Sequence, residues 1–97
     1  MAKKATSPKR RRVKFEVLAE PNSKVFLAGT FNDWSDSAKE LTEKDGDGCY
    51  SGTLLLAPGE YEYKFIINGD WQIDAENPNF NQNKMGTLNS VVKVESK

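Results

Sequence analysis

Residues 61–71, with the sequence YEYKFIINGDW, constrain the fold of this chain more than any other stretch. Large apolar side chains alternate along it with other residues, the period of two that a half-buried β-strand requires. The predicted core-facing residues are Tyr61, Tyr63, Phe65 and Ile67, and the predicted outward-facing ones are Glu62, Lys64 and Ile66. The dipeptide Asn68-Gly69 follows directly, and Asn-Gly best tolerates the positive φ angles of a tight hairpin turn. The stretch therefore predicts a strand that carries Lys64 towards solvent, a turn, and Trp71 just beyond the turn.

The rest of the chain repeats this pattern of short strands and turns. Apolar runs predict strands at residues 13–19, 24–29, 49–56 and 90–94, with shorter pieces at 38–42 and 71–73. Turn-forming residues separate them, and residues 30–36 and 74–84 are predicted loops. No segment shows the apolar stripe of an amphipathic helix. With 97 residues, the chain is predicted to form one all-β domain, an immunoglobulin-like antiparallel β-sandwich.

Charge is distributed unevenly along the chain. Residues 1–12 contain six basic and no acidic groups, whereas the remaining 85 residues carry 8 basic and 14 acidic groups, a net charge of −6. We therefore expect a basic, disordered N-terminal tail over residues 1–12 and a folded domain over residues 13–97. Such a tail could contact nucleic acid or an acidic surface, or it could be a solvated end with no partner.

The sequence lacks the usual machinery of catalysis, because it contains no histidine and no nucleotide-binding motif. Aspartates near the tryptophans could in principle form the carboxylate pair of a glycosidase, but they stand in predicted turns, where aspartate serves local hydrogen bonding. These residues are Asp33, Asp36, Asp70 and Asp74. The DGDG run at 45–48 does not continue as a calcium-binding loop, since Cys49 and Leu56 stand where oxygen ligands would be needed. We predict a protein that is not an enzyme and needs no metal or cofactor.

A location is suggested by what the sequence does not contain. No apolar run reaches membrane-spanning length, and no secretory signal is recognisable near the N-terminus. Cys49 is the single cysteine, so an internal disulfide is excluded. These features predict a cytoplasmic protein with no membrane partner.

The two tryptophans are the candidate functional residues. Trp34 lies in a predicted loop, and Trp71 follows a predicted turn. Each indole could bury itself against the edge of the sandwich, or it could offer a flat apolar face to a sugar ring or a base. Polar groups that could then bind hydroxyls or base edges are available at Lys64, at Thr87 and at several asparagines.

Three segments resemble one family of carbohydrate-binding domains. They are VFLAGTFNDWS at 25–35, GEYEYKFIINGDW at 59–71 and MGTLN at 85–89. In their order, spacing and residue identities they are similar to the glycogen-binding domain of the AMP-activated protein kinase β subunit. They are also similar to carbohydrate-binding module family 48 and the isoamylase-type early-set domains. The likeness covers about residues 13–95 and implies an antiparallel β-sandwich, in agreement with the strand pattern.

The resemblance also implies an α-glucan site. Trp34 and Trp71 match the family's two tryptophan platforms, and Lys64 matches a lysine that hydrogen-bonds sugar hydroxyls. Thr87 and Asn89 match polar residues of the family's C-terminal loop. Met85 stands where a leucine packs against the sugar, and this change conserves volume, so the contact is expected to persist.

These observations favour a stand-alone, non-catalytic module that binds α-1,4-glucans such as glycogen, maltooligosaccharides or cyclodextrin. The alternative is a docking module that recruits a glycogen-metabolism enzyme or a kinase partner and carries a vestigial glucan site. A third hypothesis, nucleic-acid binding by the basic tail and the tryptophans, is disfavoured by the acidic charge of residues 13–97.

Overall fold

The computed structural model describes residues 10–43 and 46–95 of the chain. Eight β-strands and one short 3₁₀ turn, η1, account for the regular structure of this part. The elements are β1 (Arg11–Leu18), β2 (Val25–Gly29), η1 (Thr30–Asn32), β3 (Glu40–Glu43), β4 (Cys49–Leu56), β5 (Gly59–Ile67), β6 (Asp70–Gln72), β7 (Phe80–Gln82) and β8 (Leu88–Val94). Over the described ranges there is no helix of the length and apolarity needed to cross a membrane.

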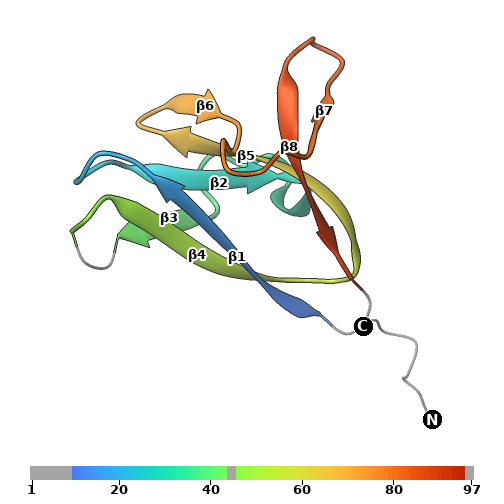
Figure 1. Ribbon diagram of the computed structural model, residues 1–97, viewed down its shortest axis with the longest axis horizontal. Helices are drawn as coiled ribbons and strands as arrows, with labels where there is room; N and C mark the ends of the chain where they lie inside the picture. The colour runs from blue at the N-terminus through green and yellow to red at the C-terminus, as the bar shows by residue number, and fades with distance from the viewer. Residues whose placement is uncertain (1–9, 44–45, 96–97) are drawn as a thin grey trace.

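All strand pairs are antiparallel, and together they form one strongly curled sheet. The order is β1-β4-β3-β2-β5-β8-β7, with β6 added to β5. The curl passes through β3, which pairs with β2 through Glu40 and Leu41 and with β4 through Thr42 and Glu43. Figure 1 shows the result: β1 and β4 cross one side of the molecule, while β6, β7 and β8 stand on the other. The prediction of an all-β antiparallel sandwich fold is confirmed.

The core lies between the two halves of the curled sheet. Phe15, Tyr50 and Leu56 enter it from β1 and β4, and Tyr63 and Phe65 enter it from β5. The ring of Phe15 meets the ring of Tyr63 edge to face, with 5.0 Å between centroids. Each fully buried side chain of this size contributes about 1.5–3 kcal/mol to folding. Because one face of β5 is occupied by the core, its other face is left for a function.

Burial along β5 follows the predicted alternation in part, since Tyr61 and Ile67, which were predicted to face the core, are half-buried and pack against it. Tyr63 and Phe65 are buried as predicted, whereas Ile66 was predicted to face outwards and is also buried, at 4% exposure. In the sheet Ile66 lies directly opposite Phe26 on β2 and Trp71 on β6. Directly opposite residues share a face and touch, so two aromatic neighbours cover this outward position.

Several strand boundaries differ from the sequence prediction by one or two residues, and one strand was not predicted. β1 begins at Arg11, inside the predicted tail, because β4 is long enough to pair with it: Arg11 lies opposite Leu56. β5 begins at Gly59, two residues before the alternation predicted from Tyr61. β7 lies inside the predicted loop at residues 74–84, where it pairs with β8. The remainder of the predicted tail, residues 1–9, and Asp45 of the rejected calcium loop lie outside the described residues.

Candidate functional site

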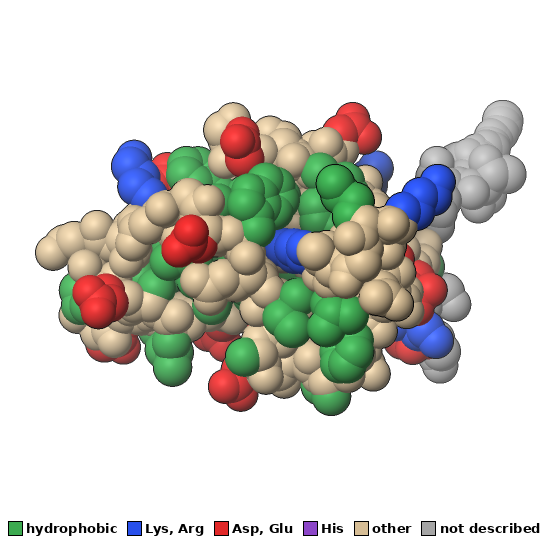
Figure 2. Space-filling view, turned by 90° about the horizontal axis from the view of Figure 1, so that it is seen from above, with side chains coloured by type: hydrophobic (Ala, Val, Ile, Leu, Met, Phe, Trp, Pro, Cys, Tyr) green, Lys and Arg blue, Asp and Glu red, His purple; other side chains and the backbone are tan. Residues whose placement is uncertain are grey.

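A groove of about 720 Å³ lies on the outer face of β5 and β8. It collects all six residues that the sequence predicted for a site, Trp34, Lys64, Trp71, Met85, Thr87 and Asn89, together with Glu62, Asn83 and Lys84. Figure 2 looks onto this side of the molecule, where hydrophobic side chains stand on both sides of a basic side chain. The groove is therefore apolar at its walls and polar at its base, the usual composition of a small-molecule site.

Trp34 is held by a strained loop that follows β2. Asp33 and Trp34 both have left-handed backbone angles, with φ of 56° and 60°. Each such non-glycine residue costs about 1–2 kcal/mol. The side chain of Asn32 stabilises the loop, since its Oδ1 accepts the Gly29 N–H at 3.1 Å and its Nδ2 donates to Leu27 O at 3.1 Å. These bonds place the half-buried Trp34 at the edge of the groove.

Gly29, at the start of this loop, cannot be replaced without displacing its neighbours. A Cβ atom there would collide with the backbone oxygen of Glu62 and would lie 2.7 Å from the ring of Phe31. The Gly29 carbonyl also accepts the Trp34 N–H at 2.8 Å. Close approach of the loop to β5 therefore depends on the missing side chain.

Trp71 lies on β6, just past the predicted turn. Asn68 and Gly69 have φ angles of 51° and 89°, and the Asn68 carboxamide oxygen accepts the Lys24 N–H at 2.9 Å. The prediction of a two-residue hairpin turn is confirmed. Trp71 remains 46% exposed, which is unusual for a residue of this size that is there for packing. Its indole thus presents an uncovered apolar face.

Lys64 lies at the base of the groove and is half-buried rather than carried into open solvent as predicted. Its Nζ donates a hydrogen bond to Thr87 Oγ1 at 3.3 Å. The difference arises because the loop between β7 and β8, which carries Thr87, lies close enough to β5 to contact Lys64. The ammonium is consequently held in place, with N–H groups left for a ligand.

Asn83 organises the loop that carries Met85 and Thr87. Its Oδ1 accepts the N–H groups of Met85 at 2.9 Å and Thr87 at 3.1 Å. Its Nδ2 donates to Thr87 Oγ1 at 2.6 Å and to Asn89 Oδ1 at 3.3 Å. Gly86 completes the turn with a φ of 88°. Met85 is left 85% exposed at the tip of this loop, while Asn89 is 6% exposed at its base.

Glu62 provides a negative charge beside Lys64 in the groove. Its carboxylate accepts a hydrogen bond from Asn89 Nδ2 at 2.8 Å, so it fixes the orientation of that amide. Sequence reasoning missed Glu62, although the alternation along β5 places it on the same face as Lys64. It also missed Lys84 and Asn83. Asn83 could have been found from its position three residues before Gly86, because this spacing of asparagine and glycine is common in tight turns.

The arrangement offers binding groups and no recognisable catalytic centre. Over residues 10–43 and 46–95 there is no cluster of three histidine, cysteine, aspartate or glutamate side chains that could hold a metal. Asp74, one of the predicted turn aspartates, accepts hydrogen bonds from the Tyr63 hydroxyl at 2.7 Å and from the Glu76 N–H at 3.0 Å. Burial raises the pKa of Tyr63 above its ordinary value. These two groups belong to the packing of the domain and lie outside the groove lining.

The chain is similar to one protein family and to two plant proteins. Residues 13–97 match the family model described as the glycogen recognition site of AMP-activated protein kinase. The chain is 37% identical over 83 residues to protein FLOURY ENDOSPERM 6, chloroplastic, of Oryza sativa subsp. japonica, a match covering 86% of this chain and 15% of that protein. It is 43% identical over 60 residues to protein PTST homolog 2, chloroplastic, of Arabidopsis thaliana, covering 60% of this chain and 11% of that protein.

A kinase subunit is also similar. The chain is 33% identical over 71 residues to the 5'-AMP-activated protein kinase subunit beta-1 of Rattus norvegicus, covering 73% of this chain and 24% of the subunit. The chain thus spans a quarter or less of each of these three relatives. The predicted cytoplasmic location is contradicted, because the two plant relatives are named as chloroplastic proteins.

Proposed function

The chain belongs to the family of the glycogen recognition site of AMP-activated protein kinase, and we propose that it binds α-1,4-glucans without catalysing their conversion. Membership of this family makes the chain a carbohydrate-recognition domain. The identity of the glucan, the mode of binding and the absence of catalysis are parts of the proposal. The observation that carries the proposal is that one groove brings together an indole from the loop after β2, an indole from β6, and Lys64, Thr87 and Asn89.

Stacking on the two tryptophans supplies the apolar part of binding. The C–H face of a glucose ring is flat and apolar, and it fits the face of an indole. An aromatic contact of this kind is worth about 1 kcal/mol beyond the area that it buries. Trp71 is 46% exposed and needs no rearrangement to accept a sugar. Trp34, in its strained loop, lines the same groove. Met85 would add a flexible apolar contact from the loop tip.

Hydrogen bonds supply the orientation of the sugar. Glucose hydroxyls both donate and accept, and the groove offers both kinds of partner. Lys64 has N–H groups beyond the one that is bonded to Thr87, and the Glu62 carboxylate has lone pairs beyond the one that accepts from Asn89. An open groove buries only part of a ligand, so affinity should lie roughly between micromolar and millimolar, or about −8 to −4 kcal/mol.

The test is a titration of tryptophan fluorescence with β-cyclodextrin and with maltoheptaose, at low and at high salt. A saturable change that is the same at both salt concentrations is expected, because a neutral sugar releases no counterions. Nucleic-acid binding would instead weaken steeply with salt. A glucan of the same size with β-linkages serves as the control for non-specific sugar contact. No fluorescence change at millimolar ligand would contradict the proposal.

A docking role is the second candidate. Leu18 and Leu55 are exposed at 73% and 55% on the strand pair β1–β4, away from the groove. The two leucines stand at opposite ends of one outer face of this strand pair, and a partner that covers both would be a glycogen-metabolism enzyme or a kinase. Amylase-treated lysate would supply such a partner without glucan as a bridge. Recovery of one stoichiometric protein, lost in the Leu55→Glu variant and retained in Trp71→Ala, would favour this candidate over glucan binding.

A further inference from the structure

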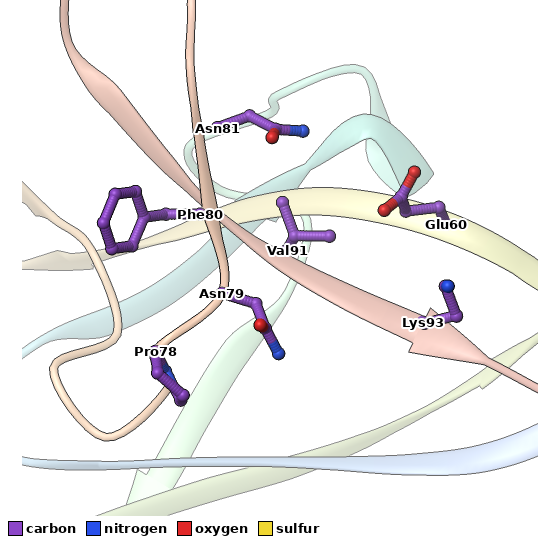
Figure 3. Close-up of a pocket in the computed structure, with 7 residues that line it drawn as sticks. All are labelled: Glu60, Pro78, Asn79, Phe80, Asn81, Val91 and Lys93. Carbon is purple, nitrogen blue, oxygen red and sulfur yellow. The ribbon is translucent and has the colours of Figure 1, made fainter.

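The face that bears the groove continues into a second hollow of about 400 Å³. It lies between β7 and the C-terminal half of β8, and Figure 3 shows the side chains around it. Its lining is Glu60, Pro78, Asn79, Phe80, Asn81, Val91 and Lys93. The family resemblance gave no role to any of these residues, and none of them lines the groove of the two tryptophans.

Strand register places the hollow and the groove on one continuous surface. Glu60 pairs with Lys93 and Glu62 pairs with Val91, and directly opposite residues of an antiparallel pair share a face. Side chains on one face recur at every second residue, so Lys64, Glu62 and Glu60 follow one another along β5. Moving along this row leads from the base of the groove into the second hollow.

Glu62 lines the groove and links it to the second hollow through hydrogen bonds. Its carboxylate accepts a hydrogen bond from Asn89 in the groove at 2.8 Å and another from Asn81 in the second hollow at 3.3 Å. Asn81 and Asn89 lie directly opposite each other on β7 and β8. A ligand that fills the groove up to Asn89 therefore reaches Asn81 next.

The second hollow has polar groups that are free for a ligand. Glu60 and Lys93 face each other across the strand pair but do not form an ion pair. Within residues 10–43 and 46–95 the ion pair is Lys14–Glu16, at 3.2 Å. Over the same residues the carboxamide of Asn79 makes no hydrogen bond to the protein. Val91, 7% exposed, closes the base of the hollow. Figure 3 shows the ring of Phe80 on the other side of β7 from Glu60 and Lys93.

We propose that this second hollow is a polar extension of the glucan site, which binds the glucose units of a linear chain that run on past the two tryptophans. The inference rests on the proposed function. Carboxylate, ammonium and carboxamide groups together match hydroxyls that both donate and accept. Because the hollow lacks an aromatic platform, it adds hydrogen bonds to a chain already stacked on Trp34 and Trp71 and does not hold a sugar alone.

A length preference follows from this geometry. A short maltooligosaccharide fills the groove and ends at Glu62, whereas a longer linear chain also contacts Asn79 and Lys93. β-Cyclodextrin is a closed ring, so it can stack on the tryptophans but cannot extend a free end along β5. The extension therefore distinguishes long linear chains from short or cyclic ones.

The experiment is calorimetric titration of the full chain and its Asn79→Ala and Lys93→Ala variants. The ligands are maltotetraose, β-cyclodextrin and a linear maltodextrin long enough to pass Glu62. Each variant is expected to weaken maltodextrin binding about threefold to tenfold, the worth of one hydrogen bond, and to leave the other two ligands unchanged. Lys14→Ala, which removes an exposed lysine from β1, is the control for loss of a positive charge.

The possible outcomes distinguish failure of the extension from failure of the tryptophan site on which it rests. If the wild type binds β-cyclodextrin and the variants bind maltodextrin as tightly as the wild type does, the extension is refuted and the tryptophan site stands. If a variant weakens all three ligands equally, the effect is general and the extension is again refuted. If the wild type binds none of the ligands, the proposed function fails and the extension fails with it.

Discussion

Lys64 on β5 donates a hydrogen bond from Nζ to Oγ1 of Thr87, 3.3 Å away and 23 positions later in the chain. The same hydroxyl oxygen accepts a second bond from Asn83 Nδ2 at 2.6 Å. A hydroxyl has two lone pairs and one hydrogen, so with both lone pairs occupied Thr87 can only donate. Lys64 is a donor by nature. At this point of the groove the protein thus presents donors only, and it selects ligand oxygens that can accept.

Replacing Thr87 by valine should weaken glucan binding about fivefold to tenfold. Valine keeps the shape of threonine but removes the donor to the ligand and the acceptor that holds Lys64, at a cost of about 1 kcal/mol or slightly more. Thr87→Ser retains the hydroxyl and should bind within about twofold of the wild type. Calorimetry with maltoheptaose measures both variants, and equal affinities for valine and serine would show that the hydroxyl is not used.

Replacing Trp71 by alanine should remove most glucan binding while the domain stays folded. The indole is 46% exposed, so its truncation leaves no buried cavity, and the β5–β6 pairing uses its backbone. Loss of one stacking contact with its buried area is expected to cost about 1–3 kcal/mol, which moves a weak binder towards the limit of detection. Trp71→Phe, with a smaller ring, should retain part of the affinity. A variant that melts well below the wild type and binds normally per folded molecule would make the tryptophan structural.

Much of the fold could be predicted from the sequence because local pattern and long-range packing agree. The alternation at residues 61–67 and the Asn68-Gly69 turn give a strand and a hairpin that the structure confirms. β7 was missed because Phe80–Gln82 is three residues long and exposed throughout, so nothing in its pattern distinguishes it from a loop. It is a strand only because β8 pairs with it.

The candidate site could be predicted only in part. Residue type and predicted turns already indicated the two tryptophans, Lys64 and Thr87. The family resemblance added Met85 and Asn89, and the structure brings all six into one groove. Glu62 gains its place through a contact with Asn89, 27 positions away, and a sequence does not state such a contact. Asn83 acts through four side-chain hydrogen bonds, three inside its own loop and one to Asn89 on β8, so its turn signature gives the turn but not the groove that the turn supports.

Replacing Asn83 by alanine should weaken glucan binding about threefold to tenfold with a smaller effect on stability, because it frees the loop that positions Met85 and Thr87. The Asn83→Asp variant distinguishes the role of the accepting amide oxygen from that of the donating NH₂ group. Aspartate still accepts the N–H groups of Met85 and Thr87, but it cannot donate to Thr87 Oγ1 or to Asn89 Oδ1. If the turn bonds are what matters, aspartate binds like the wild type and alanine does not. Affinity from calorimetry and melting temperature from circular dichroism are measured together, and an alanine variant with unchanged affinity would refute the positioning role.

Tyr63 makes the stability of the domain sensitive to alkaline pH. It is 3% exposed, its hydroxyl donates to Asp74 Oδ2 at 2.7 Å, and it accepts from Asn77 Nδ2 at 3.0 Å. Burial raises the pKa of Tyr63 above the value of about 10 that a tyrosine has in the unfolded chain. The stabilisation is therefore complete below about pH 10 and is lost as the pH rises from there towards the folded-state pKa, because the unfolded chain then binds fewer protons than the folded one.

The Tyr63→Phe variant isolates this contribution. Near neutral pH it should be less stable than the wild type by about 1–3 kcal/mol, because Asp74 and Asn77 lose a buried hydrogen-bond partner. Above about pH 10 the wild type should lose up to about 1.4 kcal/mol for each further pH unit from this group alone, and the variant should not, so the two stabilities converge. Urea unfolding at a series of pH values on both sides of this point measures the difference directly. Curves that stay parallel through the alkaline range would mean that the folded domain titrates Tyr63 as the unfolded chain does, and that the hydrogen bonds to Asp74 and Asn77 do not hold its proton.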